Sequence, residues 1–242
     1  MGGIELQKKQ VIPFINLFIN YKNKNKMRIS TDYFQQQDVL FLAKDLLGKS
    51  IFTNMDGQIS GGIIVETEAY KGTTDKASHA YGGRRTKRNE IMYAEGGVIY
   101  VYLCYGIHHL LNIVTGSKDI PDAILIRSIL STHGEELMLK RRGKTRMTPD
   151  LTCGPGNVSK ALGIGIKENG ISLSGDKIWL EDRGVIFPET NIKATPRIGV
   201  EYAQEDASLP YRFCNVSYIK QLKSHELQSF RSFSRQYRSV AR

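Results

Sequence analysis

Cysteine is scarce in this 242-residue chain, and its scarcity excludes two classes of protein. The three cysteines, Cys104, Cys153 and Cys214, are widely spaced and form no Cys-x-x-Cys pair. An odd number without a close pair argues against a disulfide framework and against a structural zinc site. We therefore expect a reduced compartment, which is the cytoplasm or nucleoid in a prokaryote and the nucleus in a eukaryote, and we do not expect secretion.

Long apolar runs are also missing. The N-terminal candidate, residues 11–19, is interrupted by Pro13 and Asn16, whereas a membrane-spanning helix needs about 20 mostly apolar residues. The run leads into Asn-Lys repeats rather than into small residues, so it does not predict a secretory signal either. We expect no membrane partner.

Acidic residues are in deficit only near the two ends. The chain has 34 Lys and Arg against 24 Asp and Glu, a formal charge of +10. Residues 1–30 and 220–242 each hold six basic residues and one acidic residue, whereas 31–219 hold 22 of each. A positive excess favours a polyanionic partner. We predict a basic N-terminal tail over 1–30, one globular domain over 31–219, and a basic C-terminal tail or helix over 220–242.

Hydrophobic periodicity predicts an α+β fold: a single domain with a curved, mainly antiparallel β-sheet flanked by helices. Apolar residues recur at helical spacing over 39–47 and stop at Gly48. The capping-box spacing of Thr132 and Glu135 predicts a helix that ends at Gly143. Strands and helices do not alternate as a doubly wound parallel sheet requires. The remaining predicted elements are a hairpin of 50–53 and 61–70 around a turn at 54–57, strands at 98–104, 110–115, 123–129 and 177–181, and a short helix that follows 153–156 and ends near 162.

Two glutamates share one face of the predicted strand Val65-Glu-Thr-Glu-Ala-Tyr70. Glu66, Glu68 and Tyr70 alternate with Val65, Thr67 and Ala69. The commonest explanation of such a pattern is an exposed, solvated strand face. A second explanation is a general base beside an aromatic wall, and a third is a metal site of Glu66, Glu68 and His79, although these residues lack a recognisable ligand spacing.

A tyrosine-rich strand is the second feature with chemical meaning. Tyr100 and Tyr102 share one face of the strand 98–104, and strand tyrosines commonly pack in the core. Tyr105-Gly106 lies between two β-runs, which places a large aromatic residue at a turn. We expect Tyr105 either to pack as a lid or to insert into a partner, as the wedges of minor-groove proteins do.

Two basic clusters lie within the formally neutral body of the chain. The first contains Arg84, Arg85, Lys87 and Arg88, and the second, 140–146, includes Arg141 and Arg142. Charged runs are usually solvated loops, but next to glycines and tyrosines they are also suitable for contacts to DNA phosphates.

These motifs resemble, in order and spacing, the alkyladenine (3-methyladenine) DNA glycosylase family. The resemblance extends from about Val39 to Phe213 and leaves out both basic tails. The matching segments are Val65–Tyr70, His79, Gly82-Gly-Arg84, Arg88-Asn89, Tyr100–Tyr102, Tyr105-Gly106, Asn112, Leu125–Arg127, Gly154–Gly156 and Arg197–Val200.

The resemblance implies a monofunctional enzyme that flips an alkylated purine out of duplex DNA and hydrolyses its N-glycosidic bond. Lesions of the 3-methyladenine and 7-methylguanine type are implied, and hypoxanthine stays open. By the same resemblance Glu68 and Arg127 are catalytic, Glu68 as the general base and Arg127 as a water-holding residue. Tyr105, on a protruding hairpin, would intercalate in the DNA. Tyr70, His79, Tyr102 and Asn112 would form the base pocket.

The resemblance implies no cofactor and no metal, and we expect a monomer. Two alternatives from other classes are a non-catalytic binder of damaged DNA and a metal-dependent nuclease. The departure Ile107-His108-His109 after the predicted wedge is less bulky than the residues found in some members of the family.

Overall fold

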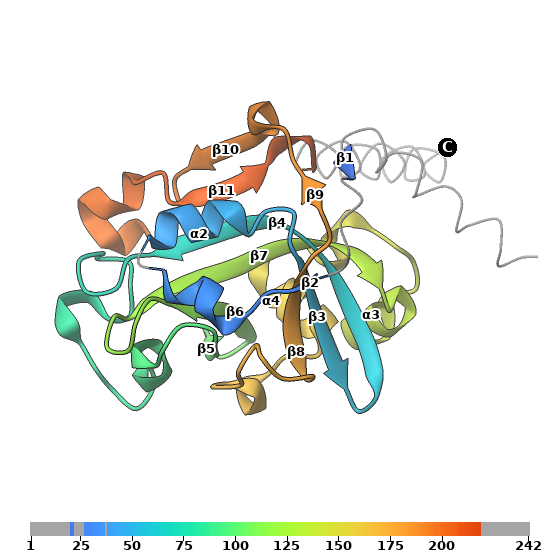
Figure 1. Cartoon of the computed structure of the whole chain (residues 1–242), viewed down its shortest axis with the longest axis horizontal. Coiled ribbons are helices and arrows are strands. Elements are labelled where there is room, and N and C mark those ends of the chain that lie inside the picture. The colour runs from blue at the N-terminus through green and yellow to red at the C-terminus, as the bar shows by residue number, and fades with distance from the viewer. Residues whose placement is uncertain (1–19, 22–26, 37, 219–242) are drawn as a thin grey trace, which may run out of the picture.

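The computed structural model describes residues 20–21, 27–36 and 38–218, and it is built around one antiparallel sheet. The sheet order is β2-β8-β3-β4-β7-β6-β5, and β11 pairs with β4 and carries β10 on its other side (Figure 1). The predicted α+β class, with a mainly antiparallel sheet flanked by helices, is therefore confirmed. The strands are β2 (Met27–Arg28), β3 (Ser50–Met55), β4 (Gln58–Tyr70), β5 (Ile99–Cys104), β6 (His108–Thr115), β7 (Asp122–His133), β8 (Ile178–Asp182), β10 (Ile192–Thr195) and β11 (Arg212–Asn215).

The long strand β4 is the centre of this sheet. Its first half pairs with β3, residues 66–68 pair with β11, and β7 accompanies nearly its whole length. A small separate pair joins β1 (Asn20–Tyr21) to β9 (Val185–Ile186). The segment that carries both glutamates is thus enclosed by strands on both of its edges.

Within the described residues, the sheet is packed by the α-helices α2 (Val39–Asp45), α3 (Glu135–Arg142) and α4 (Pro155–Leu162). Helix α2 begins where the Asp38 carboxylate accepts hydrogen bonds from the backbone N–H groups of Leu40 and Phe41. Helices α3 and α4 each end at a glycine in the left-handed region, Gly143 and Gly163. The three predicted helices are present.

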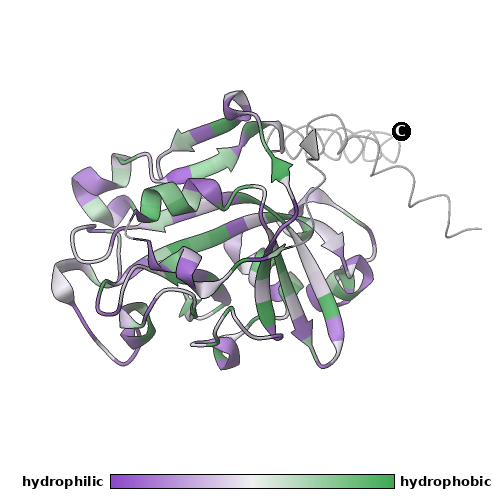
Figure 2. Ribbon diagram, in the orientation of Figure 1, coloured by the Kyte–Doolittle hydropathy of each residue, from purple (hydrophilic) through white to green (hydrophobic). Residues whose placement is uncertain are grey.

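The hydrophobic core lies where the helices meet the strands. Leu42, Leu46, Ile64, Ile124 and Leu162 are fully buried, and they come from α2, the turn after it, β4, β7 and α4. Figure 2 shows that green, apolar stretches run along the central strands. Burial of these side chains fixes the sheet on which the site is built.

Two local predictions are wrong. The turn between β3 and β4 is not 54–57 but the two residues Asp56-Gly57, both with positive φ, because the strands pair up to Met55 and Gln58. The capping box at Thr132 does not form, because β7 continues to His133 and Gly134 precedes α3.

The predicted basic tails lie largely outside the described residues. Within the predicted N-terminal tail, Met27 and Arg28 pair with Asp182 and Glu181 of β8. Residues 219–242, which contain the whole predicted C-terminal tail, are not described. In the part of the chain that is described, none of the helices has the length and apolar character needed to span a membrane.

Candidate active site

The register of four neighbouring strands places one residue from each in a row across the sheet. Glu68 of β4 pairs with Leu125 of β7, Leu125 pairs with Asn112 of β6, and Asn112 pairs with Tyr100 of β5. Directly paired residues of antiparallel strands project from the same face. This row therefore joins Glu68 to the predicted pocket residue Asn112 and to the tyrosine-rich strand.

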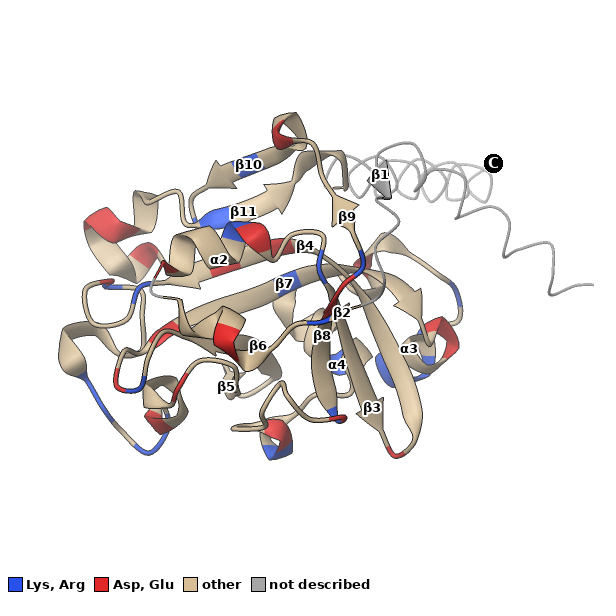
Figure 3. Ribbon diagram, in the orientation of Figure 1, with Lys and Arg blue, Asp and Glu red and all other residues tan. Residues whose placement is uncertain are grey.

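Irregular pairing between β4 and β7 places Arg127 beside the glutamates. Glu66 pairs with Ser128 and Thr67 pairs with Ile126, so Arg127 stands in a bulge without a partner in the register. Neighbouring residues of a regular strand point to opposite faces, but a bulge re-aims side chains. As a result Arg127 and Ser128 both bond to the same carboxylate, that of Glu66. Figure 3 shows the acidic segment of β4 next to the basic segment of β7.

The Glu68 carboxylate is fully buried, at 0% exposure, and is held by three groups. Its Oε1 accepts a hydrogen bond from the backbone N–H of Ile198, at 2.8 Å. Its Oε2 accepts one from the Tyr70 hydroxyl, at 2.9 Å, and lies 3.3 Å from Nη1 of Arg127. The side chain thus has a single defined orientation.

Glu66 neutralises and anchors the arginine. Its Oε1 accepts hydrogen bonds from Arg127 Nε at 3.1 Å and from Arg212 Nη1 at 2.9 Å, and its Oε2 accepts one from Ser128 Oγ at 2.6 Å. Burial raises the pKa of Glu66, but the charge of Arg127 and the hydrogen bonds from Ser128, Arg212 and Arg127 outweigh it, so the pKa lies below its ordinary value. With exposures of 3% for Glu66 and 0% for Glu68, the alternative of a solvated strand face is wrong.

An aromatic cluster lies next to the glutamates. Tyr100 and Tyr102 stack with ring centroids 5.4 Å apart, and His79 meets Tyr102 edge-on at 4.5 Å. The Nδ1 atom of His79 is 2.9 Å from the Tyr100 hydroxyl. Burial and then the charge of Glu68 raise the pKa of the Tyr70 hydroxyl well above its usual value. The hydroxyl therefore stays a hydrogen-bond donor to Glu68.

The amide of Asn112 is fixed in place. Asn112 is 3% exposed, and its Nδ2 donates to the backbone carbonyl oxygens of Tyr100 and Leu110 at 3.1 and 3.3 Å. Such a buried, doubly bonded amide cannot turn without leaving donors unsatisfied.

His79 is expected to stay neutral at physiological pH. Burial, followed by the charges of Arg88 and Arg84, lowers the pKa of His79 to about 4. In the unfolded chain its pKa returns to about 6.5, so the unfolded state binds more protons between these two values. The contribution of His79 to the free energy of unfolding is therefore lost as the pH falls through this window.

Two measurements check this expectation. An NMR titration of the histidine ring protons, assigned with His79→Gln, should show no midpoint near 6.5 for His79. Urea unfolding should show a larger loss of stability in the wild type than in His79→Gln when the pH is lowered from 7 to about 5. Equal losses in the two proteins would contradict the assignment.

The tip of the β5–β6 hairpin projects into solvent. Tyr105 is 87% exposed and has a φ of 49°, in the left-handed region, and Gly106 follows with a φ of 71°. Ile107, next in the tip, is 73% exposed. His108 packs closely against Gly156 of α4. A Cβ at position 156 would lie only 2.8 Å from the His108 ring. The base of the hairpin is therefore held against α4 while its tip stays free of contacts that would bury Tyr105.

The first basic cluster lies beside the aromatic cluster, and its members have different environments. Arg88 donates to the Leu103 carbonyl at 3.1 Å and stands over the Tyr102 ring, 5.4 Å from its centroid. Arg85 pairs with Glu90 and Asp119. Arg84 and Lys87 are exposed.

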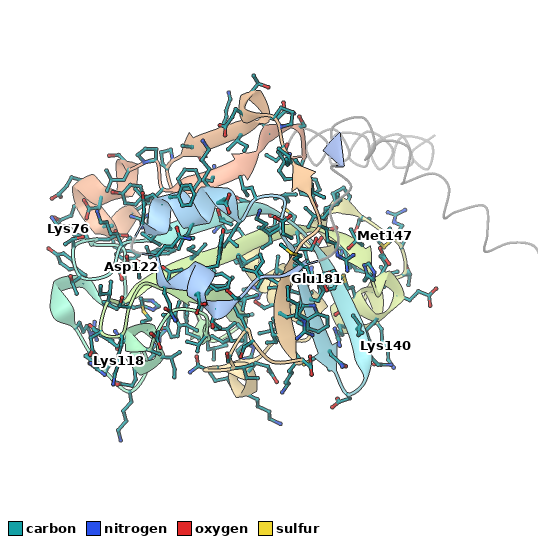
Figure 4. The ribbon with its side chains drawn as sticks, in the orientation of Figure 1. Lys76, Lys118, Asp122, Lys140, Met147 and Glu181 are labelled. Atoms are coloured by element: carbon teal, nitrogen blue, oxygen red, sulfur yellow. The ribbon has the colours of Figure 1, made fainter. Side chains whose placement is uncertain are left out.

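The second cluster lies elsewhere in the molecule. Arg141 donates to Ser60 Oγ and to the Ala161 carbonyl, and Arg142 donates to the carbonyls of Leu151 and Asp150. Figure 4 places Lys140 and Met147 at one end of the molecule and Lys76 and Asp122 at the other. Arg141 and Arg142 thus join α3 to its neighbours, and contacts of theirs to phosphate stay a prediction.

The residues of the metal-site alternative are not assembled as ligands. Both glutamate side chains bond to Arg127, whereas the His79 ring bonds to Tyr100. Across the described residues, no group of three or more His, Cys, Asp or Glu side chains is arranged to hold a metal ion.

Several residues of the site were not predicted from the sequence. They include Ser128 and Arg212, which hold Glu66, and Ile198, whose backbone N–H holds Glu68. Arg197, beside Ile198, forms a buried ion pair with Asp75. The motif Arg197-Ile-Gly-Val200 was among the segments that resemble the glycosylase family, so it indicated a functional region. Its residue types alone did not predict a role for any of its residues.

Comparison with known proteins shows which family has this sequence pattern. The family model described as Methylpurine-DNA glycosylase (MPG) matches residues 33–218. The chain belongs to this family. A candidate 3-methyladenine DNA glycosylase of Chlamydia felis is 46% identical over 182 residues, which cover 75% of this chain and 92% of the relative.

Further relatives carry the same name. The protein of Chlamydia pneumoniae is 48% identical over 182 residues, covering 75% of this chain and 91% of its own. That of Bacillus cytotoxicus is 43% identical over 192 residues, covering 74% of this chain and 92% of its own. The match to methylpurine-DNA glycosylases thus includes every residue of the row across the sheet. The predicted family resemblance is confirmed.

Proposed function

We propose that this protein is a DNA repair enzyme that extrudes an alkylated purine nucleotide from duplex DNA and hydrolyses its N-glycosidic bond, leaving an abasic site. The observation that carries the proposal is the buried Glu68 carboxylate, oriented by Arg127, Tyr70 and the Ile198 N–H next to an aromatic cluster. The names of the relatives support 3-methyladenine as a substrate, and we include 7-methylguanine because both alkylated bases are cationic.

The aromatic residues suit a cationic base. Alkylation at N3 or N7 gives the purine a positive charge, which makes it a good leaving group. Stacking such a cation on an electron-rich ring contributes about 0.5–2 kcal/mol. A damaged base is also easier to extrude, because it pairs and stacks less well. We assign Tyr70, His79 and Tyr102 to the walls of the base pocket on this basis.

Glu68 is the proposed general base. A carboxylate oxygen has two lone pairs, and among the described residues Oε1 accepts one hydrogen bond, from the Ile198 N–H. The second lone pair can accept a proton from the water that attacks C1′ of the sugar. The negative charge also stabilises the oxocarbenium-like transition state as positive charge develops on the sugar.

Arg127 and Asn112 have proposed supporting roles. Arg127 is held through its Nε by Glu66, which directs Nη1 to the Glu68 carboxylate. Asn112, fixed by two carbonyls, presents a rigid polar surface that would crowd the 2-amino group of an ordinary guanine. The pocket thereby disfavours a normal base by shape.

Removing the ring of Tyr105 tests its proposed role as the intercalating wedge. Tyr105→Ala should weaken binding to lesion-containing duplexes about tenfold, because the ring no longer fills the space left by the flipped nucleotide. Its thermal stability should stay near that of the wild type, because substitutions at exposed positions change stability by only about 0.5 kcal/mol. Fluorescence anisotropy and thermal unfolding measure the two quantities. A large loss of thermal stability would instead indicate that Tyr105 packs against the fold and is not a wedge.

One assay tests the proposed function as a whole. The protein is incubated without metal with duplexes that each contain one defined lesion, namely 3-methyladenine, 7-methylguanine or hypoxanthine, and alkali-labile sites are counted. We expect abasic sites without direct strand breaks from the cationic lesions. Binding without base release would favour the non-catalytic alternative, and metal-dependent strand breaks would favour a nuclease.

We further propose that the protein acts as a monomer on double-stranded DNA. Arg84, Lys87 and Arg88 lie in an exposed segment beside the pocket and suit phosphate contacts on the flipped strand. The bacterial source of the named relatives supports a location on the nucleoid.

A further inference from the structure

Arg197 and Asp75 form an ion pair that is almost completely inaccessible to solvent. The side chains of Arg197 and Asp75 are 0% and 1% exposed. Arg197 Nη2 donates to Asp75 Oδ1 at 2.8 Å, and Nη1 donates to Oδ2, so the pair is bidentate. Such a pair is costly to bury and stabilises little compared with apolar residues of similar volume. Its presence therefore calls for a reason other than stability.

The pair adjoins the strand that carries the proposed base. Arg197 Nη1 also donates to the carbonyl of Ala69, the residue between Glu68 and Tyr70, at 2.9 Å. The guanidinium lies over the Tyr70 ring, 4.8 Å from its centroid. Tyr70 in turn donates its hydroxyl to Glu68. Arg197 therefore contacts the ring that we assign to the pocket wall.

The residue after Arg197 reaches the base directly. The backbone N–H of Ile198 donates to Glu68 Oε1 at 2.8 Å. The ion pair fixes where this N–H lies, because Arg197 is anchored both to Asp75 and to β4. Two of the three groups that orient Glu68 thus belong to Tyr70, whose ring Arg197 contacts, and to Ile198, which follows Arg197 in the chain.

We propose that Arg197 and Asp75 act as one positioning unit that orients Glu68 for catalysis and sets how strongly the pocket favours a positively charged base. The inference rests on the proposed function, because it takes Tyr70 as a wall of the base pocket. Asp75 balances the charge of Arg197 behind the Tyr70 ring. Without that balance an arginine cation would repel a cationic purine stacked on the same ring.

The first test removes the balancing charge but keeps the shape. Asp75→Asn is compared with wild type for binding to two duplexes, one with the cationic 7-methylguanine and one with the neutral hypoxanthine. A 2′-fluoro sugar at the lesion blocks cleavage, so that the Kd alone is measured. We expect the ratio of the Kd for 7-methylguanine to the Kd for hypoxanthine to rise about tenfold.

A matched control comes from a similar pair elsewhere in the fold. Arg183 donates to Glu181 at 2.7 Å and lies over the Phe52 ring at 4.3 Å, on the part of the sheet formed by β8 and β3. Glu181→Gln also removes a carboxylate from an arginine that contacts an aromatic ring. It should leave the ratio of Kd values unchanged, and a similar change in both variants would overturn the proposal.

A second variant keeps the proposal testable if Asp75→Asn does not fold. Arg197→Gln with Asp75→Asn removes both charges and leaves a pair that can still share a hydrogen bond. We expect its single-turnover excision of 7-methylguanine at saturating enzyme to fall at least about tenfold, with little change in the Kd for the blocked duplex. An unchanged rate would overturn the positioning role.

The outcomes separate this inference from the proposed function. If wild-type protein releases no alkylated base, the proposed function is wrong. The ratio of Kd values of Asp75→Asn still tests whether the pair sets the preference for a positively charged base. If wild type is active and Asp75→Asn loses affinity equally for both lesions, the ion pair is only structural and the inference is wrong.

Discussion

Glu68→Gln is expected to slow the excision of 3-methyladenine or 7-methylguanine by about 10²–10⁴-fold, the range that a general base contributes. Glutamine has nearly the same shape but cannot take a proton from water. Binding to lesion-containing DNA should be retained, because Glu68 is fully buried and the proposed pocket walls are other residues. Single-turnover excision and anisotropy titrations measure the two effects.

Glu66→Gln is the matched control for this prediction. Glu66 is on the same strand and shares Arg127 with Glu68, but it lies between Arg127, Arg212 and Ser128 rather than beside the aromatic cluster. We expect Glu66→Gln to lose stability and to keep far more activity than Glu68→Gln. Near wild-type excision by Glu68→Gln would show that another group is the base.

Arg127→Met is expected to have the largest effect on stability. It leaves the buried carboxylates of Glu66 and Glu68 without their shared cation, and removing one partner of a buried pair typically lowers the free energy of unfolding by about 3–5 kcal/mol. Burial lowers the pKa of Arg127, but the charges of Glu68 and then Glu66 raise it above its ordinary value, so the cation persists in the folded protein. Urea unfolding at neutral pH measures the loss.

A double-mutant cycle isolates the charge pairing. Adding Glu66→Gln to Arg127→Met removes one of the two carboxylates that lost the Arg127 cation, so the double variant should lose less stability than the two single variants together. Additive losses would mean that Arg127 stabilises the fold through packing and not through the carboxylates.

Strand periodicity predicted which side chains of β4 and β5 lie together. Glu68 and Tyr70 were expected on one face, and the Tyr70 hydroxyl does donate to the Glu68 carboxylate. Tyr100 and Tyr102 were likewise expected on one face, and their rings stack. Both predictions concern residues two positions apart on one strand, where the geometry of the extended backbone decides the result.

Features that depend on pairing between distant segments were not predictable from the sequence. The bulge at Arg127 results from the register of β4 against β7, and the residue types at 125–128 do not predict a bulge. The contact from Ile198 to Glu68 joins residues 130 positions apart. The ion pair of Arg197 with Asp75 spans 122 positions. Periodicity carries no information on such separations, so these partners require the folded structure.

The capping box at Thr132 was wrongly predicted for the same reason, because pairing between distant strands decides the conformation there. Thr132 and Glu135 have the correct spacing, but β7 pairs with β4 as far as His133, opposite Gly61. Pairing with a neighbouring strand outweighed a helix-start pattern that is worth only about 1 kcal/mol. Gly134, which adopts the left-handed conformation, then makes the sharp change from strand to helix.

The complete burial of Glu68 has a consequence for when the enzyme can act. A side chain with 0% exposure does not touch bulk water, yet hydrolysis requires a water molecule at its carboxylate. If Glu68 is the general base, this water has to reach a carboxylate that the Tyr70 hydroxyl and the Ile198 N–H already contact. On the proposed mechanism the reactive water would enter together with the substrate, because the proposed base is closed to solvent in the free protein. The same mechanism would protect undamaged DNA during the search, because a nucleotide that stays stacked in the duplex would not expose the proposed base.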